Sequence, residues 1–376
     1  MHLNNAGASL MPAPIVDAIT THLDLEASIG GYEAELEAAA EIGAAYENVA
    51  GLLGTSGSNI AFSEHATASF VAALSAVRFS AGDVVLTTRN DYVSNQIQYL
   101  ALADRFGVEV LRAPDAPEGG VDLAAIEGLI HRRRPRLVAV THIPTNSGLV
   151  QDVTAIGAMC RARDILYLVD GCQSVGQMPV DVEAIGCDFF SATARKYLRG
   201  PRGAGFLYVS DRALDAGLEP LFPDMRGADW VAPDLYQPAP DAKRFETWEF
   251  FWGLVRATGG AAKYATDLGL DAIRERSWGL ADQLRGMFGE MDGVHCLDRG
   301  PRLCAIVTAS VKGWHPQDLV RELRARGINT TGQVGTDAVI DYEQKGVDGS
   351  LRVSPHYFNT EQELATLVAA LEELLP

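Results

Sequence analysis

Polar side chains that could do chemistry stand just beyond several apolar runs of this chain. Asp170 closes the run ILYLVD, and Lys196 comes four residues after the run DFFSA. Thr67 and Thr145 follow the runs NIAFS and RLVAVTH. A lysine amine can act as nucleophile or base, a carboxylate can hold a nearby cation, and hydroxyls can bind an anion. If the runs lie side by side, these groups share one site.

The runs that carry these residues predict buried strands. Most are almost continuously hydrophobic, as strands covered on both faces are. Helical stretches lie between them, which favours an α/β fold with a mostly parallel sheet and crossover helices. Such sheets bind ligands beyond the carboxyl ends of their strands, where the polar residues stand. Seven strands are predicted, over Asn59–Ser63, Asp83–Thr87, Val108–Ala113, Arg136–His142, Ile165–Asp170, Asp188–Ala192 and Gly203–Val209.

The same groups are those that pyridoxal 5′-phosphate (PLP) requires. A lysine forms a Schiff base with its aldehyde and then moves protons, and an aspartate keeps its pyridine nitrogen protonated. The phosphate needs backbone N–H groups at a helix start, hydroxyls and a cation. Arg195, Lys196, Arg199 and Arg202 place four cations within eight residues. In a chain of net charge −18, that cluster suits an anionic cofactor.

Two domains are expected from the length of 376 residues. The large, PLP-binding domain is predicted over residues 15–256, and the small α+β domain is predicted to combine residues 1–14 with 257–376. Pro12 and Pro14 are predicted to open an amphipathic helix that is broken at Gly30-Gly31, and a second helix is predicted over residues 33–53. Residues 210–250 are rich in Pro, Asp and aromatic residues and are predicted to be irregular.

Nearly the whole sequence resembles the class V aminotransferases, of PLP fold type I. The family includes cysteine desulfurases, selenocysteine lyases, kynureninases and isopenicillin-N epimerase. The resemblance implies a large domain with a mostly parallel seven-stranded sheet flanked by helices, and a smaller C-terminal α+β domain. It rests on the segments HLNNAGAS, VTHIPTNSGLV, VDGCQSVGQMPVDV, SATARKYLRGPRGAGFLYV, RFETWE and LRVSPHYFNTEQEL.

The resemblance also implies roles at the cofactor. Lys196 matches the Schiff-base lysine, Asp170 the partner of the pyridine nitrogen, and Gln173 the residue that hydrogen-bonds the phenolic oxygen. Tyr92 falls where desulfurases have a histidine stacked on the ring. Four residues match positions that contact the phosphate: Ala66, Thr67, Thr193 and Arg195.

At the substrate, Arg352 matches the arginine that binds the α-carboxylate, a bidentate contact that fixes the orientation of the Cα–H bond. Asn5 and Gly7, in the opening segment, are expected close by. Desulfurases place an asparagine beside the substrate. Register gives Thr145 at this position, with Asn146 adjacent, and the sequence does not choose between the two.

The resemblance further implies a homodimer with active sites at the subunit interface. Members of the family often bind the phosphate through a residue of the partner subunit. The segment RFETWE occupies the corresponding position, so Thr247 and Trp248 are candidates for a contact across the interface.

Two departures from the desulfurase pattern matter for function. Arg195 stands where desulfurases have a histidine, and arginine binds phosphate but does not titrate near neutrality. Desulfurases that form a persulfide need a mobile loop cysteine shortly before the substrate arginine, and the segment NTTGQVGTDAVIDYEQKGVDGS has none. Cys172 lies two residues after Asp170 and is expected to pack against the sheet. A persulfide-relay desulfurase is therefore disfavoured.

These residues predict PLP chemistry at the α-carbon of a small amino acid. Transamination is the leading hypothesis, as the broad default of the family. The alternative is β-elimination at a C–S bond, as in the hercynylcysteine sulfoxide lyases. Epimerisation needs a second base, for which Tyr92, His142 and His356 are candidates. A non-catalytic binding protein on the same fold would have little reason to combine the lysine, the aspartate and the arginine.

The composition excludes several other classes. The chain has 31 basic and 49 acidic residues, which argues against nucleic acid or an anionic membrane as a partner. Its five cysteines have no zinc-site spacing, so we expect reduced thiols and no metal site. The first residues lack a signal-peptide pattern, and no run of about 18 apolar residues occurs. A cytoplasmic enzyme is expected.

Overall fold

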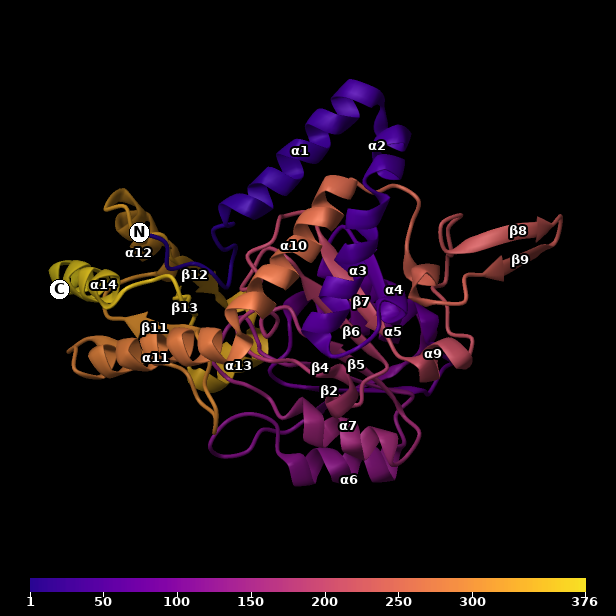
Figure 1. Ribbon diagram of the computed structural model, residues 1–376. Helices are drawn as coiled ribbons and strands as arrows, with labels where there is room; N and C mark the ends of the chain where they lie inside the picture. The colour runs from indigo at the N-terminus through magenta and orange to yellow at the C-terminus, as the bar shows by residue number, and fades with distance from the viewer.

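A seven-stranded sheet forms the centre of the computed structural model, which describes all residues 1–376 (Figure 1). Its strands are β1 (Ile60–Ser63), β2 (Val84–Thr88), β3 (Glu109–Ala113), β4 (Leu137–Thr141), β5 (Leu166–Asp170), β6 (Phe189–Thr193) and β7 (Gly205–Val209). They lie in the order β1-β7-β6-β5-β4-β2-β3. Only β7 runs against its two neighbours, so the other six strands end at the same edge of the sheet.

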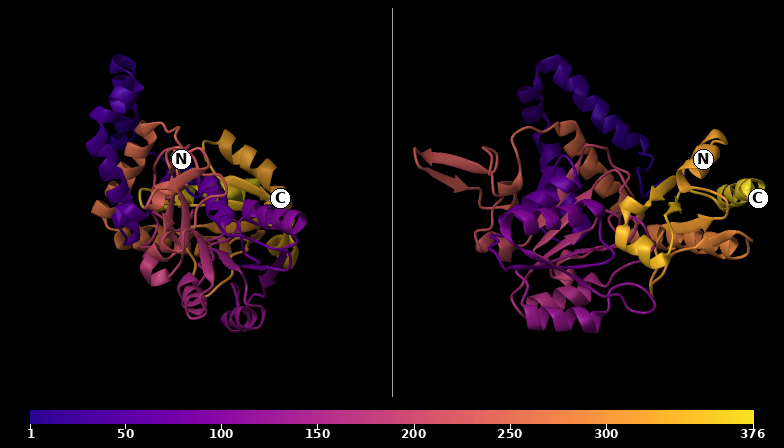
Figure 2. Two further views of the ribbon diagram at one scale, coloured as in Figure 1. Left: turned by 90° about the vertical axis from the view of Figure 1, so that its right-hand side faces the viewer. Right: turned by 180° about the vertical axis from the view of Figure 1, so that it is seen from behind.

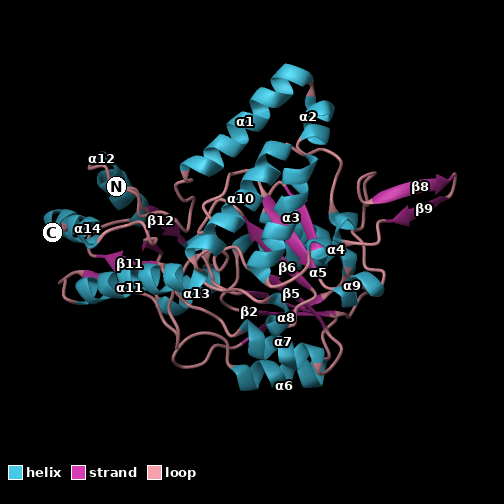
Figure 3. Cartoon of the chain, viewed as in Figure 1, coloured by secondary structure: helices cyan, strands magenta, loops and turns pink.

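Each face of this sheet is covered by helices and carries its own core, because alternate residues of a strand point to opposite sides. In β4, Leu137 and Ala139 belong to one core, whereas Val138 and Val140 belong to the other. The layers are visible in Figure 3. The first core is closed by α4 (Ala66–Ala76) and α5 (Val93–Phe106), and the second by α3 (Ala39–Leu53), α6 (Leu123–Arg133), α7 (Val153–Arg161), α8 (Val182–Ile185) and α10 (Trp252–Leu268).

The small domain is a four-stranded antiparallel sheet packed against helices, and it lies beside the large domain (Figure 2). Its strands are β10 (Val294–Cys296), β11 (Val307–Val311), β12 (Thr331–Val334) and β13 (Gly349–Val353), in the order β10-β11-β13-β12. Its helices are α11 (Leu270–Gly289), α12 (Pro316–Ala325), α13 (Val339–Lys345) and α14 (Glu361–Leu374). None of the helices in the protein combines the length and the apolar character that a bilayer span requires.

The N-terminal segment joins the small domain before the chain enters the large one. Isolated bridges pair His2 with Asn329 and Asn4 with Ser354. The predicted boundary between residues 256 and 257 falls inside α10, which stays packed in the core of the large domain. The chain therefore changes domain close to Gly269, between α10 and α11.

The predicted α/β fold, with its seven strands, is confirmed, but two local predictions were wrong. The helix expected over residues 33–53 is broken at Ala38, and residues 210–250 are not wholly irregular. The broken helix consists of α2 (Gly31–Glu37) and α3, and the helix predicted before it is present as α1 (Ala13–Ile29). Residues 210–250 contain α9 (Asp211–Asp215) and a hairpin of β8 (Ala228–Ala232) and β9 (Leu235–Pro238). The hairpin projects from the body of the molecule (Figure 1). Its strands therefore lack the buried face that makes a strand recognisable in sequence.

Candidate active site

One pocket at the carboxyl edge of the large sheet collects most of the residues predicted to bind the cofactor. The parallel strands deliver them there, because each residue lies at or just beyond the carboxyl end of its strand. Nine predicted residues line the pocket: Ala66, Thr67, Tyr92, Thr145, Asp170, Gln173, Thr193, Arg195 and Lys196.

Lys196 is the only lysine of this pocket, and it is almost completely buried. Burial lowers its pKa, and the nearby charges of Arg195 and Arg352 lower it further, against the opposing effect of Cys172 and Asp170. Its Nζ lies 5.9 Å from the centroid of the Tyr92 ring. A buried amine with a lowered pKa gives up its proton more readily. The neutral amine that results is the form that attacks an aldehyde.

Asp170 is held in a fixed orientation at the end of β5. Its Oδ1 accepts a hydrogen bond from the backbone N–H of Cys172 at 2.9 Å, and its Oδ2 accepts one from Asn95 Nδ2 at 3.1 Å. The side chain is buried, with no arginine or lysine in ion-pair contact. A buried carboxylate facing a pocket stabilises a protonated nitrogen placed against it.

The start of α4 forms a site for an anion on the same pocket. His65 Nδ1 caps the helix by accepting from the Ala68 backbone N–H at 3.0 Å, so the preceding N–H groups at Ala66 and Thr67 stay available. Gly205, the first residue of β7, allows the backbone at the start of α4 to lie close to this strand, because a Cβ at residue 205 would come within 2.7 Å of Ala66 N. Thr193 and Arg195 border the same space.

The other end of the pocket meets the small domain through Arg352, which β13 carries. Arg352 Nη1 donates to Thr145 Oγ1 at 2.5 Å, and Nη2 donates to Asn4 Oδ1 at 3.2 Å. Gln173 Nε2 also donates to Thr145 Oγ1, at 3.1 Å. Two buried atoms here have no partner, Arg352 Nε and Gln173 Oε1. A buried arginine with neutral partners only is suited to a carboxylate ligand.

Several predicted site residues lie elsewhere. Asn146 turns away from the pocket and donates to Asp341 Oδ2 at 2.8 Å, so of the two alternatives the pocket contains Thr145. The amide of Asn5 is used in a hydrogen bond to Ser354 O at 2.8 Å, and its neighbour Asn4 contacts Arg352 instead.

The remaining predicted residues lie at the margin of the site or outside it. The carbonyl oxygen of Gly7 accepts a hydrogen bond from Arg195, and Gly7 does not line the pocket. Thr247 and Trp248 are exposed and lie outside the pocket of their own subunit.

Sequence reasoning missed six residues that contact the site. Four of them line the pocket, namely His65, Thr141, Ile143 and Cys172, whereas Asn4 contacts Arg352 and Asn95 contacts Asp170. Asn4 and Asn5 are adjacent, so only the backbone conformation decides which one faces the arginine. For Asn95 the only signal in the sequence was its spacing, because a residue three positions after Tyr92 lies one helical turn from the same edge.

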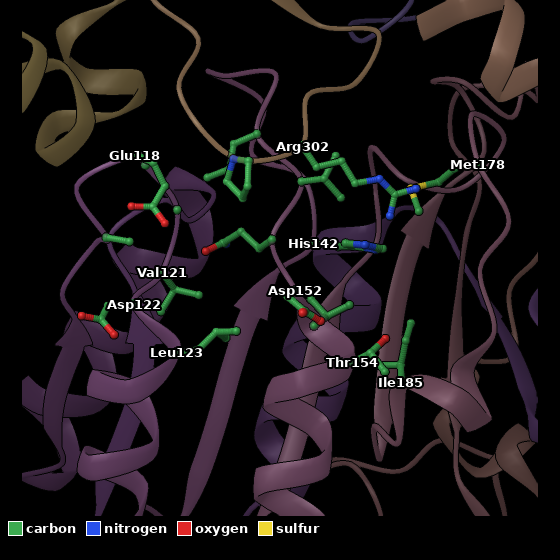
Figure 4. Close-up of a pocket in the computed structure, with 18 of the residues that line it drawn as sticks. Glu118, Val121, Asp122, Leu123, His142, Asp152, Thr154, Met178, Ile185 and Arg302 are labelled. Atoms are coloured by element: carbon green, nitrogen blue, oxygen red, sulfur yellow. The ribbon is translucent and has the colours of Figure 1, made fainter.

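A second, larger cavity of about 810 Å³ is separate from the lysine pocket (Figure 4). His142, just after β4, and Arg302 line it. No lysine lines it, so it cannot hold an aldehyde covalently. Burial lowers the pKa of His142 to about 4 and that of His356 to about 3. Neither histidine lines the lysine pocket, which leaves Tyr92 as the one proposed second base that does.

The groups of the lysine pocket fit PLP. They combine an amine for the aldehyde, a carboxylate for the ring nitrogen, and helix N–H groups with a hydroxyl and a guanidinium for the phosphate. Gln173 Oε1, buried without a partner, marks a polar position that a bound ligand would satisfy.

Comparison with known proteins identifies the family. The family model described as aminotransferase class-V matches residues 1–367. A probable cysteine desulfurase of Methanothermobacter thermautotrophicus is 30% identical over 381 residues, covering 100% of this chain and 94% of the relative. A probable cysteine desulfurase of Pyrococcus abyssi is 26% identical, with coverage of 100% and 94%.

Solved structures show the same fold. A cysteine desulfurase of Thermococcus onnurineus, in its apo form, superposes with a TM-score of 0.90 at 25% identity, covering 100% of this chain and 94% of that one. A cystine C–S lyase, C-DES, in complex with its product cysteine persulfide, gives 0.87 at 22% identity, with coverage of 100% and 98%. The chain belongs to the class V aminotransferase family of PLP-dependent enzymes, as its sequence predicted.

Proposed function

We propose that this enzyme cleaves a C–S bond at the β-carbon of a small, sulfur-bearing amino acid. The observation that carries the proposal is the buried Lys196, whose pKa is lowered, in one pocket with Asp170 and next to Arg352. Relatives named as cysteine desulfurases, and a structural neighbour named as a cystine C–S lyase, support chemistry at sulfur. Bound PLP would withdraw electrons from the substrate Cα.

The residues of this chain divide the remaining work. The guanidinium of Arg352 would bind the substrate carboxylate in place of its contacts with Thr145 and Asn4. That orientation sets the Cα–H bond toward Lys196, whose neutral amine takes the proton. The carboxylate of Asp170 would hold the protonated ring nitrogen of the cofactor, and Tyr92 would lie beside its ring. The electron pair left at Cα would form a Cα–Cβ double bond as the sulfur leaves with the electron pair of the Cβ–S bond.

The structure offers no mobile cysteine to receive that sulfur. Helix α13, in the segment before Arg352, contacts the large domain through Asp341, which accepts a hydrogen bond from Asn146 Nδ2 at 2.8 Å. Asp341 also pairs with Lys345 of the same helix at 2.7 Å. The segment contains no cysteine. Cys172 does line the pocket, but burial and the charge of Asp170 raise its pKa, so it stays a thiol. We infer that sulfur departs as a small molecule.

Transamination is the second candidate, favoured by the family name and by the same placement of Lys196. It begins with the same proton transfer and differs in where the proton is returned. Of the three second bases predicted for epimerisation, Tyr92 is the one that lines the pocket. A purely binding role would not need a nucleophilic lysine. A cytoplasmic location stays a prediction.

We also propose a homodimer with shared active sites. The hairpin of β8 and β9 carries large apolar side chains that are exposed to solvent: Trp230 is 79% exposed and Leu235 is 60% exposed. An isolated two-stranded hairpin is only marginally stable in water, so this hairpin needs a surface to pack on. Asp224 at the base of the hairpin accepts a hydrogen bond from Trp248 N at 2.6 Å, which connects Thr247 and Trp248 to it. A partner subunit would receive these residues.

Incubation of the PLP-loaded enzyme with cysteine, cystine and S-substituted cysteines is expected to release pyruvate, ammonia and a sulfur species. Product analysis by mass spectrometry and enzyme-coupled assays checks this. A Lys196→Ala variant controls for non-enzymatic cleavage. If the products are a keto acid and pyridoxamine phosphate, the enzyme is a transaminase and the C–S lyase proposal is wrong.

Replacing Arg352 with alanine should raise KM for amino-acid substrates on the order of 100-fold, because a charge-assisted contact with the carboxylate is lost. Arg352→Lys, which keeps the charge without the planar fork, should raise KM less. Steady-state kinetics measure the effect, and thermal denaturation separates it from unfolding. A KM within twofold of the wild type would assign the carboxylate to another group.

Light scattering is expected to give about twice the chain mass of 40.3 kDa. The double variant Trp230→Ser with Leu235→Ser should lower the measured mass toward that of the monomer, because it removes apolar area from the hairpin. Ile97→Ser, an exposed apolar residue on α5, is the matched control and should leave the mass unchanged. A monomeric wild-type protein would contradict the proposal.

A further inference from the structure

A second buried carboxylate, Asp91, is bonded to two residues that line the lysine pocket. It follows β2, just before α5, and is 5% exposed. Its Oδ1 accepts hydrogen bonds from Thr141 Oγ1 at 2.5 Å and from the Tyr92 backbone N–H at 2.7 Å. Its Oδ2 accepts from Thr87 Oγ1 at 2.8 Å and from Gln96 Nε2 at 3.1 Å. The mechanism above does not use this carboxylate.

Asn95, in the first turn of α5, connects this carboxylate to Asp170. Its Nδ2 donates to Asp170 Oδ2 at 3.1 Å and to Asp91 Oδ1 at 3.2 Å, and the residue is 2% exposed. An amide nitrogen has two hydrogens, so both are used between the two acids. The reverse orientation of the amide would place its oxygen against two carboxylates. Asp91 therefore fixes which end of Asn95 faces Asp170.

The two acids would repel one another without a donor between them. Burial raises the pKa of Asp91, and the charge of Asp170 raises it further. The amide of Asn95 keeps both carboxylates hydrogen-bonded in a place that excludes water. The same Asp91 also holds the backbone N–H of Tyr92, so one side chain orients groups on two walls of the pocket.

We propose that Asn95 and Asp91 are positioning residues that aim the Asp170 carboxylate at the ring nitrogen of the cofactor. The inference rests on the proposed function only in that PLP occupies the pocket. Asn95 acts directly, as the donor to Asp170. Asp91 acts through Asn95, and through Tyr92 it sets the wall against which the ring would lie.

An ordinary structural role would lower stability without distinguishing one cofactor from another. A positioning role acts through the contact between Asp170 and the ring nitrogen. An analogue of PLP with CH in place of the ring nitrogen lacks that contact. The affinity of the apo-protein for the two compounds, measured by titration of their absorption bands, therefore separates the two roles without reference to catalysis.

Asn95→Leu, which keeps the volume and removes the donor, should weaken binding of PLP on the order of 10-fold. It should bind the CH analogue as the wild type does. Asp91→Ala should weaken PLP binding in the same direction, because it removes the acceptor that fixes which end of the Asn95 amide faces Asp170. This second variant serves if Asn95→Leu does not fold.

Asn59→Leu is the matched control, since Asn59 is a buried asparagine that donates to Asp211 Oδ1 at 2.7 Å outside the lysine pocket. It should lose comparable thermal stability and keep wild-type affinity for PLP. If both site variants bind PLP within twofold of the wild type, or lose PLP and the CH analogue equally, the positioning role is wrong. If the wild type itself does not bind PLP, the failure lies with the proposed function.

Discussion

Burial of the Lys196 amine in one pocket with a buried carboxylate is the constraint on which the rest of the active site depends. A lysine in this position loses part of its affinity for a proton, and an aspartate in this position needs fixed donors. Water provides neither the buried environment that the amine requires nor the fixed donors that the carboxylate requires. The parallel sheet provides both, because its strands end together and place Lys196 after β6 and Asp170 at the end of the neighbouring β5.

The two domains contribute different parts of the site. The large domain holds the groups that suit the cofactor, whereas the small domain contributes Arg352, which suits the substrate. Thr145 is the contact between them, since it accepts hydrogen bonds from both Arg352 and Gln173. Substrate binding would therefore replace contacts that hold the domains together. The segment around α13 contacts the large domain through Asp341 and Asn146, and it contains no cysteine.

The fold, and the placement of Asp170 and Lys196 at strand ends, could be predicted from the pattern of the sequence for one physical reason, whereas the roles of the other candidate residues came from the resemblance to the family. Strands buried on both faces are apolar throughout, so a polar residue such as Asp170 at the end of a run is easy to identify. The choice between Thr145 and Asn146 could not be made, because it depends on the backbone path of an irregular turn. Asn95 was missed because a polar residue in a helix usually faces water. The hairpin was missed because neither of its faces is buried.

The central claim is that Lys196, and no other lysine, reacts with the aldehyde of PLP. Borohydride reduction of the PLP-loaded enzyme, followed by proteolysis and mass spectrometry, locates the covalently modified residue. The account predicts one modified peptide, which contains Lys196 and shows a mass increase matching reduced PLP. Modification at another lysine, such as Lys345, or no modification after PLP loading, would contradict it.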